Sequence, residues 1–436
     1  MAQAESTNPA AIFDDHNPPA AELYNKCVHC GFCLPTCPTY ALWGEEMDSP
    51  RGRIYLMKLG SEGKARLTDS YARHFDQCLG CMACVTACPS GVQYGKLIDA
   101  TRAQIERHYP RSWAERMRRN MGMKMFTSPA RLATARGLAS AYQKSGLCAA
   151  VRALGITKLL PKHLRSLESL MPQVRPSEKL PEVVPAQGTK RMRVGMVLGC
   201  VQDAFFSHVN AATARVLAAE GCEVVIPQPQ PCCGALMIHT GAEQQALLLA
   251  RQMIDTFERA NVDAVVVNAA GCGSNVKDYG YLLRDDPQYR ERAANFSRRC
   301  RDVAEFLAGL EPRAERKAMS LKVAYHDACH LQHAQGVAAA PRKLLKQIPG
   351  LELLELPESA ICCGSAGVYN LAQPEAAEAL GDRKARNVLS SSPDVVVTGN
   401  PGCILQIEAA LRRAGSRLRV VHTVEVLDAA IRGAKL

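Results

Sequence analysis

Runs of β-branched residues alternate with helical stretches through the second half of the chain. The apolar runs cover residues 194–198, 265–267, 323–325 and 395–397. Segments with apolar residues at helical spacing lie between them, at 212–220, 242–260 and 375–389. This alternation predicts a parallel sheet, and the ligand site of such a sheet lies at the carboxyl ends of its strands. We therefore expect α/β modules with parallel sheets in this half.

A set of cysteines repeats together with this pattern. The first set consists of Cys200, Cys232, Cys233 and Cys272, and the second of Cys329, Cys362, Cys363 and Cys403. Corresponding members are 129 to 131 residues apart. A displacement that holds its register at separate points indicates two copies of one module. We expect these copies over residues 191–315 and 316–436, with the cysteines at the carboxyl ends of the strands.

The first half of the chain reads as helical. A short helix is expected after Pro50, inside a domain that covers residues 21–100. Residues 101–190 are rich in Arg and Lys, with helical apolar spacing in pieces such as 131–147, and they end in a proline-punctuated stretch. This segment predicts a basic helical connector followed by an extended linker. The fold class is thus α+β and multidomain.

Length and cysteine usage exclude several classes of protein. At about 150 residues per domain, 436 residues predict two or three domains with ordinary cores, so the 19 cysteines need not be disulfide staples. Metal ligation in a reducing compartment is the better interpretation. Residues 1–20 lack the layout of a signal peptide and are expected to form a flexible tail. No run approaches the roughly 18 to 20 apolar residues that cross a bilayer, so we expect a cytoplasmic protein with at most peripheral membrane contact.

The chain is basic, with a formal net charge of +11. Neither a helix-turn-helix nor a zinc-finger layout accompanies the charge, and aromatic residues make up only 5% of the chain. Nucleic acid is therefore not an expected partner.

A ferredoxin signature occurs twice in the N-terminal domain. Its first copy is Cys27, Cys30, Cys33 and Cys37 followed by Pro38, and its second is Cys78, Cys81, Cys84 and Cys88 followed by Pro89. This spacing is typical of two 4Fe-4S clusters, in which the fourth cysteine of each run binds the other cluster. The predicted ligand sets are Cys27, Cys30, Cys33 with Cys88, and Cys78, Cys81, Cys84 with Cys37. Zinc would more often use a single pair of cysteines.

The repeated C-terminal cysteines are additional metal candidates. Each module offers four sulfurs, and the Gly after each vicinal pair lets the backbone approach closely. They suit one or two further iron–sulfur clusters or a zinc ion, with the second module favoured, and the alternative is that they are buried cysteines of α/β cores. His326, His330 and His333 surround Cys329 and are candidates for a direct or a supporting role. Cys148, Cys222 and Cys300 lie outside every motif, and we expect free thiols there.

The ordered motifs resemble the iron–sulfur subunits of flavin-dependent dehydrogenases, above all the glycolate oxidase family. The resemblance rests on residues 27–33 with 36–40, on 50–55, on 326–336 and on 362–367. The subunits of the anaerobic glycerol-3-phosphate enzyme are related, and the C-terminal modules also resemble the catalytic subunit of heterodisulfide reductase. That reductase family has a further cysteine where this chain has Asn275 and Gln406. Electron relay is therefore favoured over disulfide reduction.

The resemblance implies an electron-transfer subunit without a catalytic residue for glycolate. Flavoprotein subunits of the same complex would oxidise glycolate to glyoxylate, and this chain would pass the electrons toward a membrane quinone at the inner face of the cell membrane. The sequence has no G-x-G-x-x-G turn after a strand, so no flavin of its own is expected. The alternatives left open are a subunit of a glycerol-3-phosphate or lactate dehydrogenase, a heterodisulfide-reductase-like catalyst, and a binding protein with structural zinc.

Overall fold

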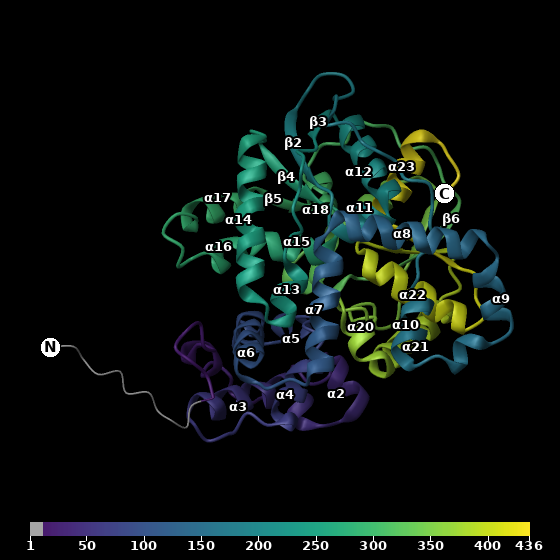
Figure 1. Cartoon of the computed structure of the whole chain (residues 1–436). Coiled ribbons are helices and arrows are strands. Elements are labelled where there is room, and N and C mark those ends of the chain that lie inside the picture. The colour runs from purple at the N-terminus through teal and green to yellow at the C-terminus, as the bar shows by residue number, and fades with distance from the viewer. Residues whose placement is uncertain (1–11) are drawn as a thin grey trace. The chain divides into compact units, whose positions relative to one another are not determined.

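The computed structural model describes residues 12–436, which form two compact units (Figure 1). One unit contains the described residues up to Arg119 together with Leu236–Gln245. The other contains Asn120–Ala235 and Ala246–Leu436. The helical N-terminal domain and the two tandem modules with parallel sheets are confirmed.

The N-terminal unit is helical, and its core lies between its helices. Met57, Phe75, Leu97 and Ile98 are fully buried there. Ser49 begins the helix expected after Pro50, because its Oγ accepts a hydrogen bond from Gly52 N at 3.1 Å. The main helices are α2 (Pro38–Trp43), α3 (Pro50–Ser61), α4 (Asp69–Asp76), α5 (Ala83–Thr86), α6 (Tyr94–His108) and the first part of α7 (Trp113–Thr127).

Part of the expected flexible tail is packed against this unit. Residues 1–11 lie outside the described residues, whereas Ile12 and Phe13 contact the core. Asp14 accepts hydrogen bonds from Arg107 Nε and His108 Nε2 at 2.9 and 2.8 Å. Arg107 and the neighbouring hydrogen bonds hold the pKa of the Asp14 carboxyl well below its usual range. Residues 12–20 are therefore part of the folded unit.

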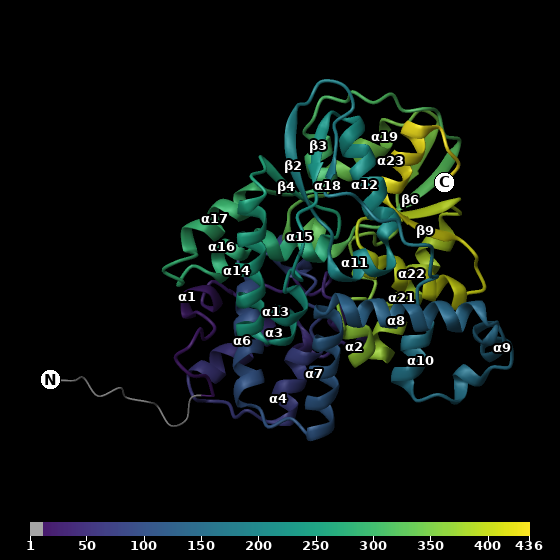
Figure 2. The same cartoon turned by 45° about the horizontal axis from the view of Figure 1, so that its top comes forward.

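The connector contributes a row of helices to the C-terminal unit. These are α8 (Pro129–Lys144), α9 (Leu147–Ala153) and α10 (Lys162–Ser169), which lie side by side in both views (Figure 2). Ser166 of α10 donates from Oγ to the Asn370 carbonyl at 2.8 Å. The linker that follows is mostly extended, but it contains a short strand, β1 (Val183–Val184), which pairs antiparallel with β3 (Cys222–Val225).

The two modules contain sheets of matching topology. The first sheet has the order β1-β3-β2-β4-β5, with β2 (Met192–Val197), β4 (Ala264–Val267) and β5 (Cys300–Asp302). The second has the order β7-β6-β8-β9, with β6 (Leu321–Tyr325), β7 (Leu351–Leu354), β8 (Val395–Thr398) and β9 (Arg419–His422). All pairings other than β1 with β3 are parallel. The expected runs of apolar residues are therefore the central strands of both sheets.

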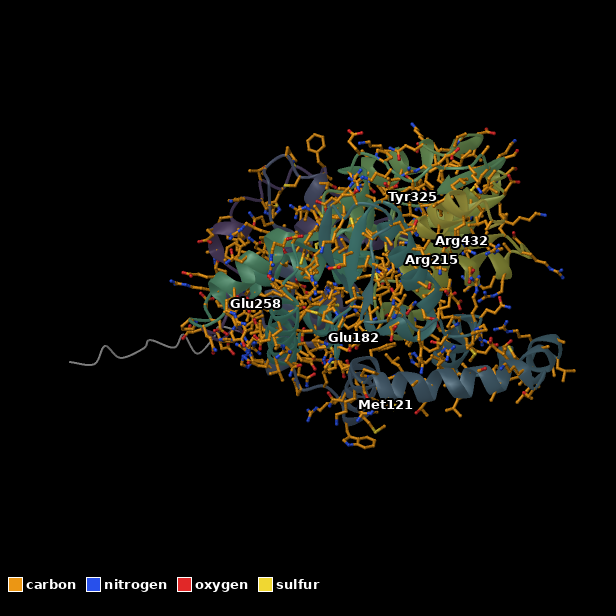
Figure 3. The ribbon with its side chains drawn as sticks, turned by 90° about the horizontal axis from the view of Figure 1, so that it is seen from above. Met121, Glu182, Arg215, Glu258, Tyr325 and Arg432 are labelled. Atoms are coloured by element: carbon orange, nitrogen blue, oxygen red, sulfur yellow. The ribbon has the colours of Figure 1, made fainter. Side chains whose placement is uncertain are left out.

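One hydrophobic core extends through both modules. Helix α12 (Ser207–Ala219) of the first module packs against α23 (Thr423–Arg432) of the second. Asp428 on α23 accepts a hydrogen bond from Arg215 Nη2 at 2.7 Å and also pairs with Arg432. Figure 3 labels the two arginines. The amide of Ala270 donates to the Gly399 carbonyl at 3.1 Å. The modules are thus joined both by apolar packing and by polar contacts.

Candidate metal centres

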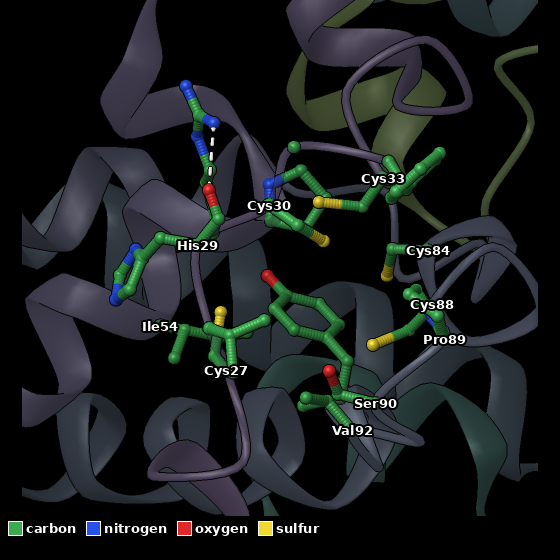
Figure 4. A pocket seen from close by; sticks show the side chains of 16 residues that line it. Cys27, His29, Cys30, Cys33, Ile54, Cys84, Cys88, Pro89, Ser90 and Val92 are labelled. Carbon is green, nitrogen blue, oxygen red and sulfur yellow. Dashed lines mark hydrogen bonds between the residues drawn. The ribbon is translucent and has the colours of Figure 1, made fainter.

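The first ferredoxin motif lies in loops around one pocket. Cys27, Cys30, Cys33, Cys84 and Cys88 line it (Figure 4). The fourth cysteine of the second run therefore lies with the first three cysteines of the first run. Cys30 is exposed, and Cys27, Cys33 and Cys88 are half-buried. This arrangement fits a cluster at the surface of the unit, and the ligand set proposed for it stays a prediction.

Four cysteines of the ferredoxin motifs are buried, among them Cys84, which also lines this pocket. Cys37, Cys78, Cys81 and Cys84 are each less than a tenth exposed. Burial raises the pKa of the Cys84 thiol well above its usual value, and the nearby charges of Cys81, Cys78 and Cys37 act in the same direction. A bound cation removes this penalty, because a metal stabilises the thiolate form. The four sulfurs together therefore fit an enclosed cluster.

Two arginines supply positive charge to this buried set. Arg53 is 1% exposed, and Arg102 donates to the Cys78 carbonyl. Burial raises the pKa of the Cys78 thiol, but the charges of Arg53 and Arg102 outweigh it, so the pKa is lowered overall. Cys78 Sγ also accepts from Gly80 N at 3.4 Å and from Tyr94 Oη at 3.6 Å. Cys78 is therefore prepared to act as a thiolate.

The first module brings its four cysteines together at the carboxyl ends of the strands. Cys200 begins α11 (Cys200–Phe205) after β2, and Cys272 lies in the first turn of α15 (Ala270–Lys277) after β4. Cys232 and Cys233 are in the loop after β3, and Cys232 Sγ is 3.7 Å from Cys200 Sγ. Hydrogen bonds from Cys200 and Cys233 lower the pKa of Cys232. The set is a four-sulfur site that fits a metal centre.

The second module repeats this arrangement with more complete burial. Cys329 Sγ is 3.9 Å from Cys362 Sγ, and Cys363 interacts with Cys403. Cys403 lies in the first turn of α22 (Pro401–Arg413) and also accepts from Asn400 Nδ2 at 3.6 Å. Gly364 has a φ of +91°, and a Cβ there would lie 2.7 Å from the Ala377 carbonyl oxygen. The Gly after the cysteine pair is therefore required by the backbone, as the motif suggested.

Asn275 and Gln406 use their amides to support the backbone. Asn275 Nδ2 donates to the Cys233 carbonyl at 2.6 Å. Gln406 Nε2 donates to the Ala377 carbonyl at 2.8 Å, and its Oε1 accepts from Asn370 at 3.2 Å. Both side chains are buried. Neither position offers a fifth sulfur, and each amide has a structural partner.

The three histidines near Cys329 have different surroundings. His330 Nδ1 is 2.7 Å from Ser274 Oγ, and His333 Nε2 is 3.3 Å from the Ala360 carbonyl oxygen. His326 alone joins Cys363 and Cys403 in a buried group whose ligand atoms lie within 4.8 Å of one another. The cysteines outside the motifs, Cys148, Cys222 and Cys300, are buried in α9, at the start of β3 and at the start of β5.

Lys384 is a residue of the second module that the sequence analysis missed. It is 2% exposed on α21 (Pro374–Ser390), and its Nζ donates to the carbonyls of Glu358 and Ser359. Burial lowers its pKa, whereas the nearby Cys363 and Cys362 oppose this change. The available signal was its place in the buried helical stripe of Ala377, Leu380 and Val388.

Family models match most of the chain. Residues 23–92 match a 4Fe-4S dicluster domain, and residues 194–277 and 323–408 each match a cysteine-rich domain. Residues 114–171 match the linker region of the glycolate oxidase iron-sulfur subunit. The expected iron–sulfur cofactors are confirmed by these matches. Among the helices of residues 12–436, none is both long and apolar enough to span a bilayer.

Individual relatives match over nearly the full length. The chain is 40% identical over 415 residues to the probable glycolate oxidase iron-sulfur subunit of Bacillus subtilis, which covers 93% of both chains. It is 35% identical over 422 residues to the glycolate oxidase iron-sulfur subunit of Escherichia coli, which covers 94% of this chain and 95% of that one. Lactate utilization protein A of an Exiguobacterium species is 31% identical over 242 residues, or 55% of this chain and 99% of the relative.

Proposed function

Because the chain belongs to the glycolate oxidase iron-sulfur subunit family, we propose that it passes electrons from flavoprotein subunits that oxidise glycolate to glyoxylate toward a membrane quinone. Bound iron–sulfur clusters supply one-electron transfer in such a subunit. The observation that carries this proposal is the presence of sulfur sites in both units, one with an exposed cysteine and the others partly or fully buried.

The exposed cysteine site of the N-terminal unit supports docking of a flavoprotein. Cys30 is exposed, and beside it in the sequence Val28 and Phe32 are 68% and 66% exposed. Apolar side chains next to an accessible cluster ligand are suited to a partner interface, where aromatic residues are enriched. We take the loop of residues 28–32 as the edge at which electrons enter. The surrounding chain positions the cysteines of this site and shields the buried set of Cys37, Cys78, Cys81 and Cys84 from water.

The connector supports peripheral contact with an anionic membrane. Leu147, Leu154, Ile156, Leu159 and Leu164 occur close together in the sequence and are 55%, 74%, 39%, 85% and 50% exposed. Basic residues are interspersed among them, including Arg152 and Lys162. Apolar side chains that enter the headgroup region together with Lys and Arg bind anionic lipid. This surface would bring the chain to the quinone pool at the inner face of the membrane.

A reconstitution experiment tests the function. The full chain is purified anaerobically, and its clusters are monitored by electron paramagnetic resonance after addition of glycolate. We expect no reduction by glycolate with this chain alone, and reduction when the flavoprotein subunits are added. Reduction of the isolated, flavin-free chain by glycolate would contradict the proposal. Lactate and glycerol 3-phosphate in the same assay distinguish the related dehydrogenases.

A lactate dehydrogenase subunit is the second candidate, because the chain is 31% identical to lactate utilization protein A over nearly all of that relative. Heterodisulfide-type catalysis has less support. The amides of Asn275 and Gln406 are engaged with backbone groups, and neither position offers a further thiolate. Faster cluster reduction with lactate than with glycolate, in the presence of the flavoprotein subunits, would favour the second candidate.

A further inference from the structure

His326 has an available nitrogen beside the sulfurs of the second module. Its backbone follows β6 directly, and its amide donates to the Val397 carbonyl at 2.9 Å. The side chain is 1% exposed, and Nδ1 is buried with no hydrogen-bond partner. A buried polar atom that lacks a partner costs about 1 to 3 kcal/mol, so an unpaired nitrogen in this place calls for a ligand.

The surroundings of the His326 ring indicate which of its two nitrogens would bind a metal. The backbone of Ser359 lies close to the ring and partly opposes the lowering of the His326 pKa by burial. Nδ1 is the ring nitrogen that is buried without a hydrogen-bond partner, so the tautomer with its proton on Nε2 leaves a free lone pair facing the interior. Metal-binding histidines commonly carry the proton on one nitrogen and leave the other free for the metal.

The sulfurs lie within reach of the same metal centre. The ligand atoms of His326, Cys363 and Cys403 all lie within 4.8 Å of one another, and all three residues are buried. They come from three separate parts of the second module, namely the end of β6, the loop after β7 and the first turn of α22. Exposed polar side chains often lie close together by chance. These three potential ligands are buried instead and come from separate segments, which favours a common ligand.

The first module lacks this nitrogen at the corresponding position. Val197 precedes Cys200 by three residues, as His326 precedes Cys329, and it is a fully apolar, buried residue. The helix that corresponds to α21 is α14 (Glu243–Arg259), which has the buried Met253 and Ile254 where Lys384 stands in the second module. The two modules therefore share a cysteine arrangement but differ in the charge and ligands that surround it.

We propose that His326 Nδ1 is a metal ligand of the second module, which gives its centre mixed imidazole and thiolate coordination, whereas the first module offers thiolates alone. The inference rests on the proposed function, in which the second module holds an iron–sulfur centre. Replacement of thiolates by imidazoles raises the reduction potential of such a centre, and the buried Lys384 acts in the same direction by stabilising added negative charge. The second centre would then accept electrons from the first.

Hyperfine spectroscopy of the full chain tests the ligand directly. The protein is produced with natural or ¹⁵N-labelled histidine, purified anaerobically and reduced, and its iron centres are examined by pulsed electron paramagnetic resonance. We expect the coupling of a directly bound nitrogen, which changes with the label. His326→Gln should remove the coupling. His330→Gln is the matched control, because its Nδ1 lies 2.7 Å from Ser274 Oγ and the ring is not a member of the group of His326, Cys363 and Cys403, and it should retain the coupling.

Two outcomes would overturn the assignment. These are the absence of a bound-nitrogen coupling in the labelled wild-type chain, and its persistence in His326→Gln. The wild-type measurement remains decisive if His326→Gln does not fold. If metal analysis finds zinc in place of iron in this module, X-ray absorption at the zinc edge replaces the hyperfine measurement. Coordination by one nitrogen and three sulfurs would then support the assignment, and coordination by four sulfurs would contradict it.

A cysteine variant separates this inference from the proposed function. Cys363→Ser should lower the iron content by about four atoms per chain if a cubane is lost. An unchanged iron and zinc content would show that Cys363 holds no metal centre. The electron relay proposed for the second module would then be wrong as well. Loss of iron in Cys363→Ser without any nitrogen coupling in the wild type would leave the relay intact and reject only His326.

Discussion

Arg53 donates from Nη2 to Asp48 Oδ1 at 3.2 Å, and these side chains are 1% and 7% exposed. The same guanidinium donates from Nε to the His74 carbonyl at 2.6 Å and from Nη1 to Thr39 Oγ1 at 3.1 Å. Thr39 Oγ1 in turn lies 3.1 Å from Cys37 Sγ. Arg53 therefore joins helices α3 and α4 to the start of α2, where Cys37 lies.

Arg53→Met should destabilise the N-terminal unit and release the buried cluster. The variant leaves Asp48 buried without its guanidinium partner, which typically costs about 3 to 5 kcal/mol. Iron content and the cluster spectrum of the purified chain measure the effect. Lys58→Gln on the same helix is the control, because its contact with Glu62 is long and exposed. A full complement of iron with unchanged unfolding in Arg53→Met would contradict this role.

Cys37→Ser should disturb the cluster held by Cys78, Cys81 and Cys84. The reason is the crossed ligand pattern, in which the fourth cysteine of one run binds the other cluster. Electron paramagnetic resonance of the reduced chain can assign the lost signal by comparison with Cys81→Ser and Cys30→Ser. Cys148→Ser, outside the motifs, should leave both signals intact. A loss that matches Cys30→Ser would show that the crossed assignment is wrong.

Phe32→Glu should slow the delivery of electrons from the flavoprotein subunits. Phe32 is exposed next to Cys30, and interface hot spots contribute about 2 kcal/mol, so we expect cluster reduction by glycolate to slow by about tenfold or more. The cluster spectra themselves should not change. Leu248→Glu, at an exposed position of the first module, is the control. Equal reduction rates in the two variants would exclude the loop of residues 28–32 as the docking edge.

Leu154→Asp combined with Leu159→Asp should weaken binding to anionic vesicles. Burial of one leucine in an apolar phase contributes about 1.5 to 3 kcal/mol, so loss of two predicts a decrease in affinity of at least about a hundredfold. Co-sedimentation with vesicles of phosphatidylglycerol and phosphatidylcholine measures it, with Leu248→Asp as the control. Binding that depends on salt but is unaffected by the two substitutions would assign the contact to the basic residues alone.

His422 predicts a loss of stability in acid. It is buried at the start of α23, where Nδ1 accepts from Val424 N at 3.2 Å, and burial lowers its pKa from 6.5 to about 4. The unfolded chain therefore gains a proton near pH 6.5, whereas the folded chain does so only near pH 4. The stability present above pH 6.5 should fall by about 2.5 kcal/mol by pH 4.5.

His422→Asn provides the comparison, since Asn keeps an acceptor at the helix start and cannot be protonated in this range. Urea unfolding of both proteins at pH 7 and pH 4.5 gives the difference, and effects of cluster loss are common to both. Burial also lowers the pKa of His208 to about 4, so the variant should lose some stability in acid as well. The same decrease in both proteins would mean that His422 has no part in the acid sensitivity.

The sequence by itself determined the features that depend on local order. Val265–Val267 could be recognised as a strand of a parallel sheet and the segment after Pro50 as a helix, because side-chain periodicity and helix-start signals involve residues only a few positions apart. The tandem repeat was equally visible, since two copies of one module keep the same cysteine spacing. These are statements about neighbours along the chain, and they held in the structure.

Only the tertiary structure decided which side chains meet. His326, His330 and His333 all lie within four residues of Cys329 in sequence, yet only His326 groups with Cys363 and Cys403. The pairing of β6 with β8 and the position of Cys403 in the first turn of α22 bring these residues together, and spacing along one strand cannot specify that. Lys384 was missed for the same reason: its ammonium is buried because carbonyls of a loop about 25 residues away accept from it. Contacts between distant segments, not local propensities, select the residues around each centre.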